Sequence, residues 1–502
     1  MPTSRSPFLP LAAALVAAVL VTSAPPAAAR KHRAAAPAAT AAAGLRVPVE
    51  YYRLPNGLRV VLSRDTTLPT TTVGVYYQIG FRIEPKGRTG FAHLFEHMMF
   101  QGTPNLKKGG LDQIVSGNGG AINGSTRFDY TNYYEVVPAH ALESVLWVEA
   151  DRMRGLDINA ASLANQQGVV KNEVRVNVLN RPYGGFPWLS LPQYANTNWN
   201  NAHNFYGDLT ELDAANLEDV KSFFDSYYTP SNAVLVVAGD FETAPAKEWI
   251  TKYFGSLPAR ATPARPDITE PAQTAEKRAS YVDKFAPRPA LAVGWHMPDR
   301  NTRDWLAMGV VDELLLQGDA SLLRQRLVRD RGMSSSIDGG VNLLGNLYNY
   351  NGPMLFTAYL IHDPSNTPDA VLGAIDSAVE EFKAKPPTQE DMDRAITTLR
   401  SGLYDVVGSS TRFGLVDLLA SFALFDDDPA RINRLEAELR SVKPEEVQAA
   451  AQRYLRKENR TILTVEAGAA PKAKAPEPAS PPASSVTPAS APAKPSTTGG
   501  AK

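Results

Sequence analysis

The pattern of apolar and polar positions in the first half of the chain changes repeatedly between strand-like and helix-like stretches. Residues 57–62 (GLRVVL) and 71–78 (TTVGVYYQ) are β-rich runs separated by a turn-prone segment, which predicts two strands. Apolar residues three and four positions apart predict helices over residues 141–153 and 162–179. Between the strands and these helices lies a stretch of different character, residues 90–103 (GFAHLFEHMMFQGT).

The second half repeats the alternation. Strands are predicted over residues 289–295, 354–360 and 461–465, and helices over residues 305–316, 369–382 and 389–407. Residues 261–280 join the two halves and are proline-rich and polar, as expected of a linker. The pattern therefore predicts an N-terminal domain over residues 47–260 and a C-terminal domain over residues 281–468.

Both ends of the chain differ from this folded part. Residues 1–29 predict a secretory signal peptide, because an apolar run from Phe8 to Val21 is followed by small residues that end in an A-x-A cleavage site. An uncleaved membrane anchor is the alternative, although the run is short for a bilayer span. Residues 30–46 are predicted to be a flexible lead-in, and the Ala-, Pro- and Ser-rich residues 469–502 a disordered tail. The signal peptide predicts export, with a periplasm as the expected compartment.

Composition narrows the class of protein. A length of 502 residues suggests two or three domains, and 44% hydrophobic with 21% charged residues is an ordinary soluble balance. A formal net charge of -1 lacks the excess of basic charge that is typical of nucleic-acid-binding proteins, so we predict no nucleic-acid partner. We also predict no membrane contact after signal cleavage. Because the chain has no cysteine, it depends on no disulfide and carries no thiol for a lipid anchor.

The stretch 90–103 carries the candidate chemistry. His93 and His97 stand four positions apart, so a helix would place them on one face with Glu96 beside them. A catalytic zinc takes three protein ligands and leaves one position to water, and a nearby carboxylate can serve as general base. The order H-x-x-E-H inverts the commoner H-E-x-x-H and is known as the inverzincin signature. The alternative is a solvated or core-satisfied histidine pair with a surface glutamate.

Two further stretches become informative beside this motif. Residues 119–126 (GGAINGST) are so rich in small side chains that either another backbone approaches them closely or they form a plain glycine loop. Glu173, within the predicted helix 162–179, is either a surface glutamate paired with a basic neighbour or the third ligand of a His, His, Glu set.

Taken together, these segments make the chain resemble zinc metallopeptidases of the pitrilysin or insulinase family, in the branch that contains the mitochondrial processing peptidase subunits. The resemblance extends from about Tyr51 to Glu466. It is carried by residues 56–58 (NGL), residues 90–103, Asn123 with Thr126, residues 172–173 (NE), residues 181–184 (RPYG), residues 227–233 (YYTPSNA) and residues 238–240 (AGD).

The resemblance implies a fold and a site. The fold is α+β, with two related α/β modules of the mitochondrial processing peptidase type, each a mixed or antiparallel sheet covered by helices, facing each other across a cavity. One zinc ion per chain would be bound by His93, His97 and Glu173, with Glu96 as the general base. The strand containing Ala121, Ile122, Asn123 and Gly124 would be a sheet edge that takes a peptide substrate as an added strand, which gives broad sequence tolerance.

The chain also departs from the family pattern. Members that act alone carry an Arg and, seven residues later, a Tyr that hold the substrate and stabilise the oxyanion, and these positions are Val328 and Ser335 here. Neither side chain can replace those donors, whose loss costs about a hundredfold or more in turnover.

Three hypotheses follow from the departure. A homologous subunit without zinc supplies the Arg and Tyr in a bacterial heterodimer, or Tyr348 or Tyr350 substitutes within this chain, or the protein is a non-catalytic structural or binding subunit. The intact zinc motif argues against the last. A second departure is Gln166, seven residues before Glu173, where the family often has a glutamate; an amide can hydrogen-bond a ligand without raising its basicity.

Overall fold

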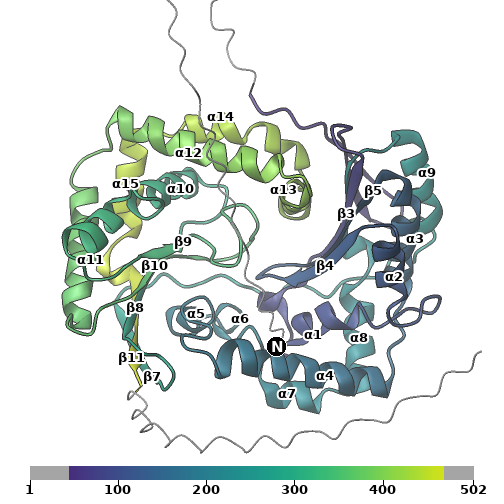
Figure 1. The fold of residues 1–502 in the computed structure, drawn as a ribbon, viewed down its shortest axis with the longest axis horizontal. Coiled ribbons are helices and arrows are strands. Elements are labelled where there is room, and N and C mark those ends of the chain that lie inside the picture. The colour runs from purple at the N-terminus through teal and green to yellow at the C-terminus, as the bar shows by residue number, and fades with distance from the viewer. Residues whose placement is uncertain (1–43, 469–502) are drawn as a thin grey trace, which may run out of the picture. The chain divides into compact units, whose positions relative to one another are not determined.

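The computed structural model describes residues 44–468. The predicted signal peptide, most of the predicted lead-in and the predicted C-terminal tail lie outside the described residues. These residues form two β-sheets with helices packed against them (Figure 1). Within residues 44–468, no helix combines the length and the apolar character needed to cross a bilayer.

The first sheet has six strands in the order β1-β2-β6-β3-β5-β4. Their bounds are Glu50–Arg53 (β1), Arg59–Arg64 (β2), Thr70–Tyr77 (β3), Ala121–Thr126 (β4), Thr131–Pro138 (β5) and Ala233–Gly239 (β6). β2 pairs in parallel with β6, β3 lies antiparallel between β6 and β5, and β4 pairs antiparallel with β5. β4 is therefore an edge of this sheet.

The second sheet has five strands in the order β7-β11-β8-β10-β9. Their bounds are Lys277–Asp283 (β7), Ala290–His296 (β8), Asp338–Gly340 (β9), Leu355–Ile361 (β10) and Arg460–Ala467 (β11). β7 pairs in parallel with β11, β8 lies antiparallel between β11 and β10, and β9 is the edge next to β10. Apart from β1, each strand of the first sheet thus has a counterpart, which confirms the predicted α+β class with two related modules.

Helices connect and cover the strands. In the first half they are Phe91–Met98 (α1), Gly110–Gly117 (α2), Leu142–Arg154 (α3), Ala160–Val174 (α4), Ser190–Ala195 (α5), Trp199–Ala202 (α6), Leu209–Ala214 (α7), Leu217–Tyr227 (α8) and Thr243–Phe254 (α9). In the second half they are Arg303–Leu315 (α10), Pro368–Lys383 (α11), Gln389–Val407 (α12), Phe413–Phe425 (α13), Leu435–Arg440 (α14) and Pro444–Tyr454 (α15).

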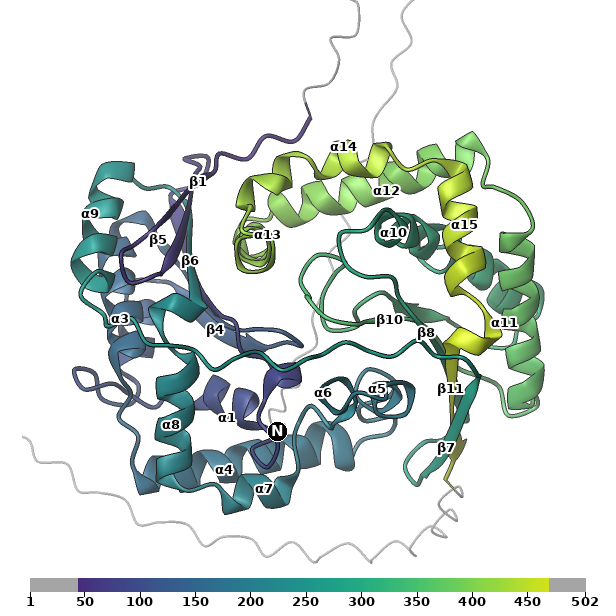
Figure 2. The ribbon, with the colours of Figure 1, turned by 180° about the vertical axis from the view of Figure 1, so that it is seen from behind.

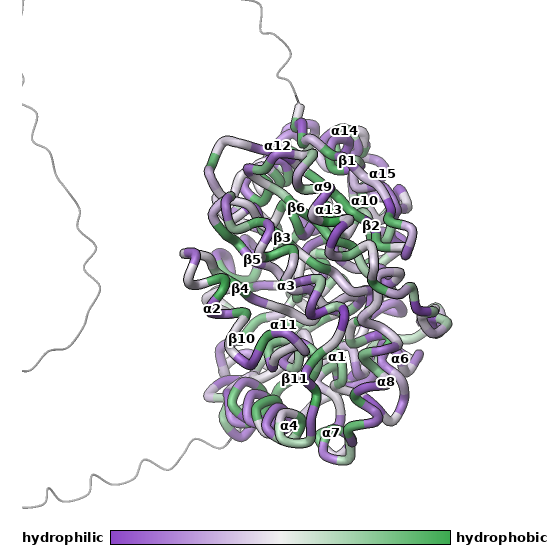
Figure 3. Tube along the Cα trace, turned by 90° about the vertical axis from the view of Figure 1, so that its right-hand side faces the viewer, coloured by the Kyte–Doolittle hydropathy of each residue, from purple (hydrophilic) through white to green (hydrophobic). Residues whose placement is uncertain are grey.

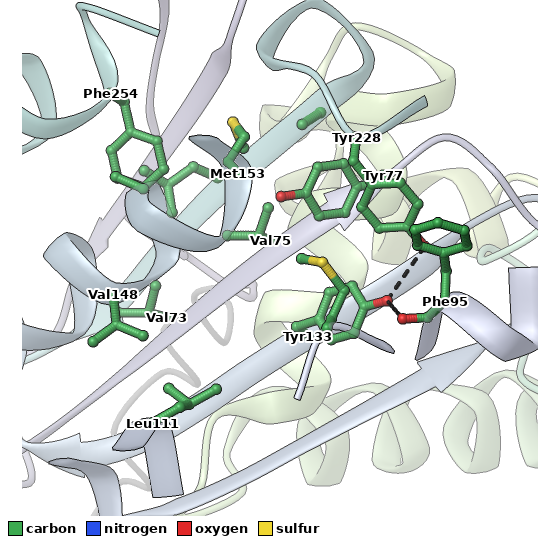
Figure 4. Close-up of a cluster of buried hydrophobic side chains, with 14 of the residues drawn as sticks. Val73, Val75, Tyr77, Phe95, Leu111, Tyr133, Val148, Met153, Tyr228 and Phe254 are labelled. Atoms are coloured by element: carbon green, nitrogen blue, oxygen red, sulfur yellow. Dashed lines mark hydrogen bonds between the residues drawn. The ribbon is translucent and has the colours of Figure 1, made fainter. Parts of the chain in front are cut away.

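Both faces of the first sheet are buried, and the alternation of side chains along β3 shows how. Val73, Val75 and Tyr77 point into one hydrophobic cluster with residues of α1, α3, α8 and α9, part of which is drawn in Figure 4. Tyr76 points the other way, into a second cluster with residues of α13. Burying one such large apolar side chain stabilises the fold by about 1.5–3 kcal/mol. The first sheet is therefore the middle layer between two sets of helices.

The helix that covers this second face comes from the other half of the chain. α13 packs on β2, β3 and β6. Hydrophobic residues, green in Figure 3, lie along both α13 and β6. In exchange, α5 from the first half packs on β7, β8 and β11 of the second sheet, as Figure 2 shows from behind. Leu191 of α5 is buried there beside Ala292 and Leu463.

Two predicted boundaries differ from the structure by more than two residues. The helix predicted over residues 162–179 is α4 as far as Val174 and then a π-helical turn, Arg175–Leu179. The last residues of the predicted linker 261–280 belong to β7. β7 is an outer strand whose side chains are alternately half-buried and exposed, so its sequence (KRASYVD) is polar and has no apolar run to mark it.

A buried hydrogen-bond network fastens α13 to the turn between β4 and β5. Asp417 of α13 accepts hydrogen bonds from the hydroxyl of Tyr130 at 2.7 Å and from the side-chain amide of Asn349 at 3.0 Å. All three side chains are buried. Removing Asp417 leaves two buried hydrogen-bond donors without their acceptor. Each unpaired buried polar group lowers the stability of the fold by about 1–3 kcal/mol.

We therefore expect Asp417→Ala to lower the free energy of unfolding by about 2–4 kcal/mol, measured by urea denaturation followed by circular dichroism. Asp405→Ala, which removes an exposed aspartate from α12, is the matched control and should stay within about 0.5 kcal/mol of the parent protein. Equal stability of the two variants would show that the network does not fasten the helix.

Candidate metal centre and active site

The motif helix α1 begins at a fixed point. Its N-cap, Gly90, has a left-handed backbone (φ 81°) and provides no side-chain cap, which leaves the first N–H groups of the helix to other partners. The buried carboxylate of Glu84 accepts two of them, from Gly90 N at 2.9 Å and Ala92 N at 2.6 Å. A Cβ on Gly90 would lie 2.7 Å from the carbonyl oxygen of Tyr206, so only glycine fits. The start of α1 is thereby fastened to two loops.

The structure brings His93, His97 and Glu173 together. The two histidine Nε2 atoms are 3.4 Å apart, and the Glu173 carboxylate oxygens lie 3.5 Å from His93 Nε2 and 3.2 Å from His97 Nε2. Zinc bonds to nitrogen and oxygen are about 2.0–2.1 Å long, so tetrahedral ligand atoms stand about 3.4 Å apart. The observed separations therefore suit a zinc ion bound between the three side chains.

The protonation state of the site also suits a metal. Glu173 reaches α1 because α4 packs against that helix. Hydrogen bonds from His93 and His97 hold the pKa of the Glu173 carboxyl well below its usual range, so the group is a carboxylate at neutral pH. His93 is 4% exposed, and its Nδ1 atom has no hydrogen-bond partner in the described part of the chain. The Nε2 atom is thus the one that faces the other two ligands.

Glu96 lies on the same helix and is held by β4. The hydroxyl of Thr126, the last residue of that strand, donates to Glu96 Oε2 at 2.7 Å. Thr126 is buried. The hydrogen bond ties the predicted general base to the strand predicted to bind substrate. From the sequence, Thr126 was a family marker without a role, because 30 positions separate it from Glu96.

Tyr206 is a site residue that the sequence interpretation missed. Its ring meets the His93 ring edge to face, with centroids 5.1 Å apart, and meets the Trp188 ring at 5.7 Å. Burial raises the pKa of the Tyr206 hydroxyl to about 12, with further contributions from the negative charges of Glu173 and Glu96. No spacing or motif singles out this tyrosine, since only the folded loop before α7 carries it to the metal ligands.

The predicted substrate strand occupies one of the two edges of the first sheet (Figure 1). β4 pairs with β5 on one side, from Ala121 opposite Val136 to Thr126 opposite Thr131. Ala121 and Asn123 are exposed, and Ile122 and Gly124 are half-buried. Within residues 44–468 no strand pairs with the other side of β4, so its edge can accept an extended peptide.

The remaining predicted positions lie as follows. Gln166 is buried, but its side-chain amide donates to Asn165 at 2.8 Å, and no hydrogen bond joins it to a candidate ligand in the described chain. Val328 lies in a π-helical turn (Arg324–Asp330) and packs against the core of the second half. Ser335 is exposed in the loop that precedes β9.

Tyr348 and Tyr350 are packing residues in this structure. Tyr348 lies between the rings of Trp305 and Phe422, each with a centroid distance of 5.7 Å. Tyr350 is 1% exposed, and its hydroxyl accepts a hydrogen bond from Trp305 Nε1 at 2.8 Å. Their surroundings do not support the hypothesis that either one substitutes for a donor at the site.

Comparison with known proteins finds similarity to two models of the M16 peptidase family. Residues 59–186 match the family model described as Insulinase (Peptidase family M16), and residues 214–399 match the model described as Peptidase M16 inactive domain. The second description agrees with the absence of a metal-binding motif from the second half of the sequence.

Similar proteins include peptidases and a subunit of the cytochrome b-c1 complex. The chain is 28% identical over 353 residues to the zinc protease PqqE of Helicobacter pylori, which covers 69% of this chain and 77% of the relative. It is 23% identical over 410 residues to the mitochondrial cytochrome b-c1 complex subunit 1 of Caenorhabditis elegans, covering 81% and 85%. It is 25% identical over 263 residues to a probable mitochondrial-processing peptidase subunit beta of Arabidopsis thaliana, covering 52% and 49%.

Solved structures show the same fold. A protease from Helicobacter pylori superposes with a TM-score of 0.77 at 25% identity, over 84% of this chain and 99% of that chain. The periplasmic protease PqqL from Escherichia coli superposes with a TM-score of 0.68 at 17% identity, over 84% of this chain and 48% of that chain.

Proposed function

Because the chain has the fold of M16 family peptidases, we propose that it is a zinc-dependent endopeptidase that binds one zinc ion per chain. The observation that carries the proposal is the convergence of His93, His97 and Glu173 at tetrahedral ligand spacing with Glu96 on the same helix. Zinc-dependent cleavage of an internally quenched peptide by the purified protein, lost on chelation and restored by added zinc, is the test.

The zinc ligands, Glu96 and Thr126 each have a separate role in the proposed reaction. A zinc ion bound by the three ligands would supply a Lewis acid that polarises the scissile carbonyl and lowers the pKa of water. Glu96 takes the proton from the attacking water and passes it to the leaving amine. The hydrogen bond from Thr126 keeps one carboxylate oxygen of Glu96 engaged, which fixes the orientation of the side chain.

β4 is the proposed substrate-binding element. A peptide that adds to its free edge through Ala121, Ile122, Asn123 and Gly124 gains main-chain hydrogen bonds whatever its sequence. The last residue of this strand contacts Glu96, so a peptide bound along β4 is led toward the general base. Peptides and unfolded polypeptides are the proposed substrates.

We further propose that a homologous subunit without zinc completes the site. Val328 and Ser335 cannot donate to an oxyanion as Arg and Tyr would, and the side chains of Tyr348 and Tyr350 are engaged elsewhere. We expect a partner that carries the Arg and Tyr to raise peptidase activity about a hundredfold over that of the chain alone. The measurement is turnover of the quenched peptide in the mixture and in each separate chain.

A matched control makes this experiment specific. The same partner with its Arg and Tyr replaced by Val and Ser should associate equally and leave activity at the level of the single chain. Full activity from the chain alone, unchanged by either partner, would contradict the heterodimer. The second candidate function is that of a non-catalytic structural or binding subunit, which the similarity to the cytochrome b-c1 subunit favours. A structural subunit would not need an intact set of zinc ligands beside Glu96, which argues against this candidate.

We propose that the protein is exported and acts in a periplasm. Support comes from the apolar run and A-x-A site in residues 1–29 and from the likeness in fold to a periplasmic protease. N-terminal sequencing of the protein from the periplasmic fraction, beginning at Arg30, would test this.

A further inference from the structure

We propose that the hydroxyl of Tyr206 donates a hydrogen bond to the carbonyl oxygen of the peptide bond being cut. This inference rests on the proposed peptidase function and assigns a substrate-contacting donor within the zinc-binding half of the chain. No motif in the sequence points to this residue.

The ring of Tyr206 has a defined place beside the metal ligands. It lies between two other rings, that of His93 at 5.1 Å and that of Trp188 at 5.7 Å, both edge to face. Its backbone is fixed by a turn, because Tyr206 N donates to Asn204 Oδ1 at 3.0 Å. The Tyr206 carbonyl oxygen also packs against Gly90, where α1 begins. The tyrosine therefore keeps its position relative to His93.

The hydroxyl is available to a ligand. Tyr206 is only half-buried, and no hydrogen bond within residues 44–468 involves its hydroxyl. The fully buried Tyr133 differs, since its hydroxyl donates to the carbonyl oxygen of Phe95 at 3.0 Å. Tyrosines with a polar tip near a ligand site commonly use it for recognition. The charges of Glu173 and Glu96, the proposed metal ligand and general base, act on the Tyr206 hydroxyl.

The chemistry of peptide hydrolysis needs such a donor. When the oxygen of water bonds to the carbonyl carbon, the π electron pair of the carbonyl moves onto its oxygen, which becomes an oxyanion. A hydroxyl that donates to this oxygen binds the transition state more tightly than the substrate, and it keeps its own proton throughout. Since Val328 and Ser335 offer no equivalent donor, Tyr206 would supply part of this stabilisation in the first half itself.

The experiment compares Tyr206→Phe with the parent protein in zinc content and in binding of two peptides. One is a peptide with a tetrahedral phosphinate in place of the scissile amide, and the other is the parent peptide, bound to each protein in the Glu96→Gln background so that it is not cut. We expect equal zinc content, equal affinity for the parent peptide, and phosphinate affinity at least about tenfold weaker in Tyr206→Phe. Tyr194→Phe, which removes the hydroxyl of an exposed tyrosine on α5, is the control and should match the parent protein.

Equal phosphinate affinity of Tyr206→Phe and parent protein would overturn the proposal while leaving the proposed function intact. Loss of zinc or of parent-peptide binding together with phosphinate binding would also overturn it, because the residue would then have a structural role. Failure of the parent protein to bind zinc would instead refute the proposed function, and this inference with it.

Discussion

Glu96→Gln lowers the turnover number of the protein by about 10²–10⁴-fold and leaves zinc content at the parent value. Glutamine has almost the same shape as glutamate and still accepts the hydrogen bond from Thr126, observed at 2.7 Å, so the helix and the ligands keep their places. An amide cannot take up the proton of water, and only the proton-transfer step is lost. The measurements are kcat on a quenched peptide and metal content by atomic absorption.

The matched control for this variant is Glu248→Gln, which changes an exposed glutamate of α9 in the same way and should retain full turnover. If Glu96→Gln loses its zinc, Glu96 is a ligand rather than a base. If it keeps both zinc and turnover, another group accepts the proton.

Alanine at His93, His97 or Glu173 removes zinc and with it peptidase activity. Each side chain offers one of the three proposed ligand atoms, and the loss of one would leave a site with two protein ligands, fewer than the three typical of catalytic zinc. We expect the purified variants to contain about a tenth or less of the zinc in the parent protein after dialysis, because each ligand contributes a large share of the binding free energy. Metal analysis and the quenched-peptide assay, run on the same samples, check both losses.

Two comparisons sharpen that result. His140→Ala, which removes an exposed histidine just before α3, should keep zinc and activity at the parent level. Glu173→Gln keeps the shape of the third ligand but removes its negative charge, so we expect intermediate zinc retention. Stoichiometric zinc in all three alanine variants would show that the metal binds elsewhere.

Much of this fold could be predicted from local pattern, for a physical reason. A strand such as β3, buried on both faces, consists mainly of β-branched and aromatic residues, and helices such as α12 carry an apolar stripe at regular spacing. The spacing of His93 and His97 likewise follows from the geometry of a single helix. Several elements were not predicted, among them β1, β5, β6, β7, β9 and α13. β1 and β7 are outer strands, which need few apolar residues.

The rest of the site depends on contacts between distant segments. Glu84 caps α1 from the preceding loop, Thr126 reaches Glu96 from β4, and Tyr206 reaches His93 from the loop before α7. None of these pairs is linked by helical or strand periodicity, so a single sequence contains no local signal for them. Glu173 was identified only through the family resemblance, for the same reason.

The exchange of α5 and α13 between the halves has a consequence for how the chain can be divided. Each sheet has one face covered by a helix that the other half encodes, so neither half buries its own sheet completely. If the peptide chain were cleaved within residues 261–276, the two fragments would stay associated, because α5 and α13 each pack on the sheet of the other fragment. If the two halves were expressed as separate polypeptides, each would expose an apolar face of its sheet. The halves would then have to associate before either could fold into a stable, soluble protein.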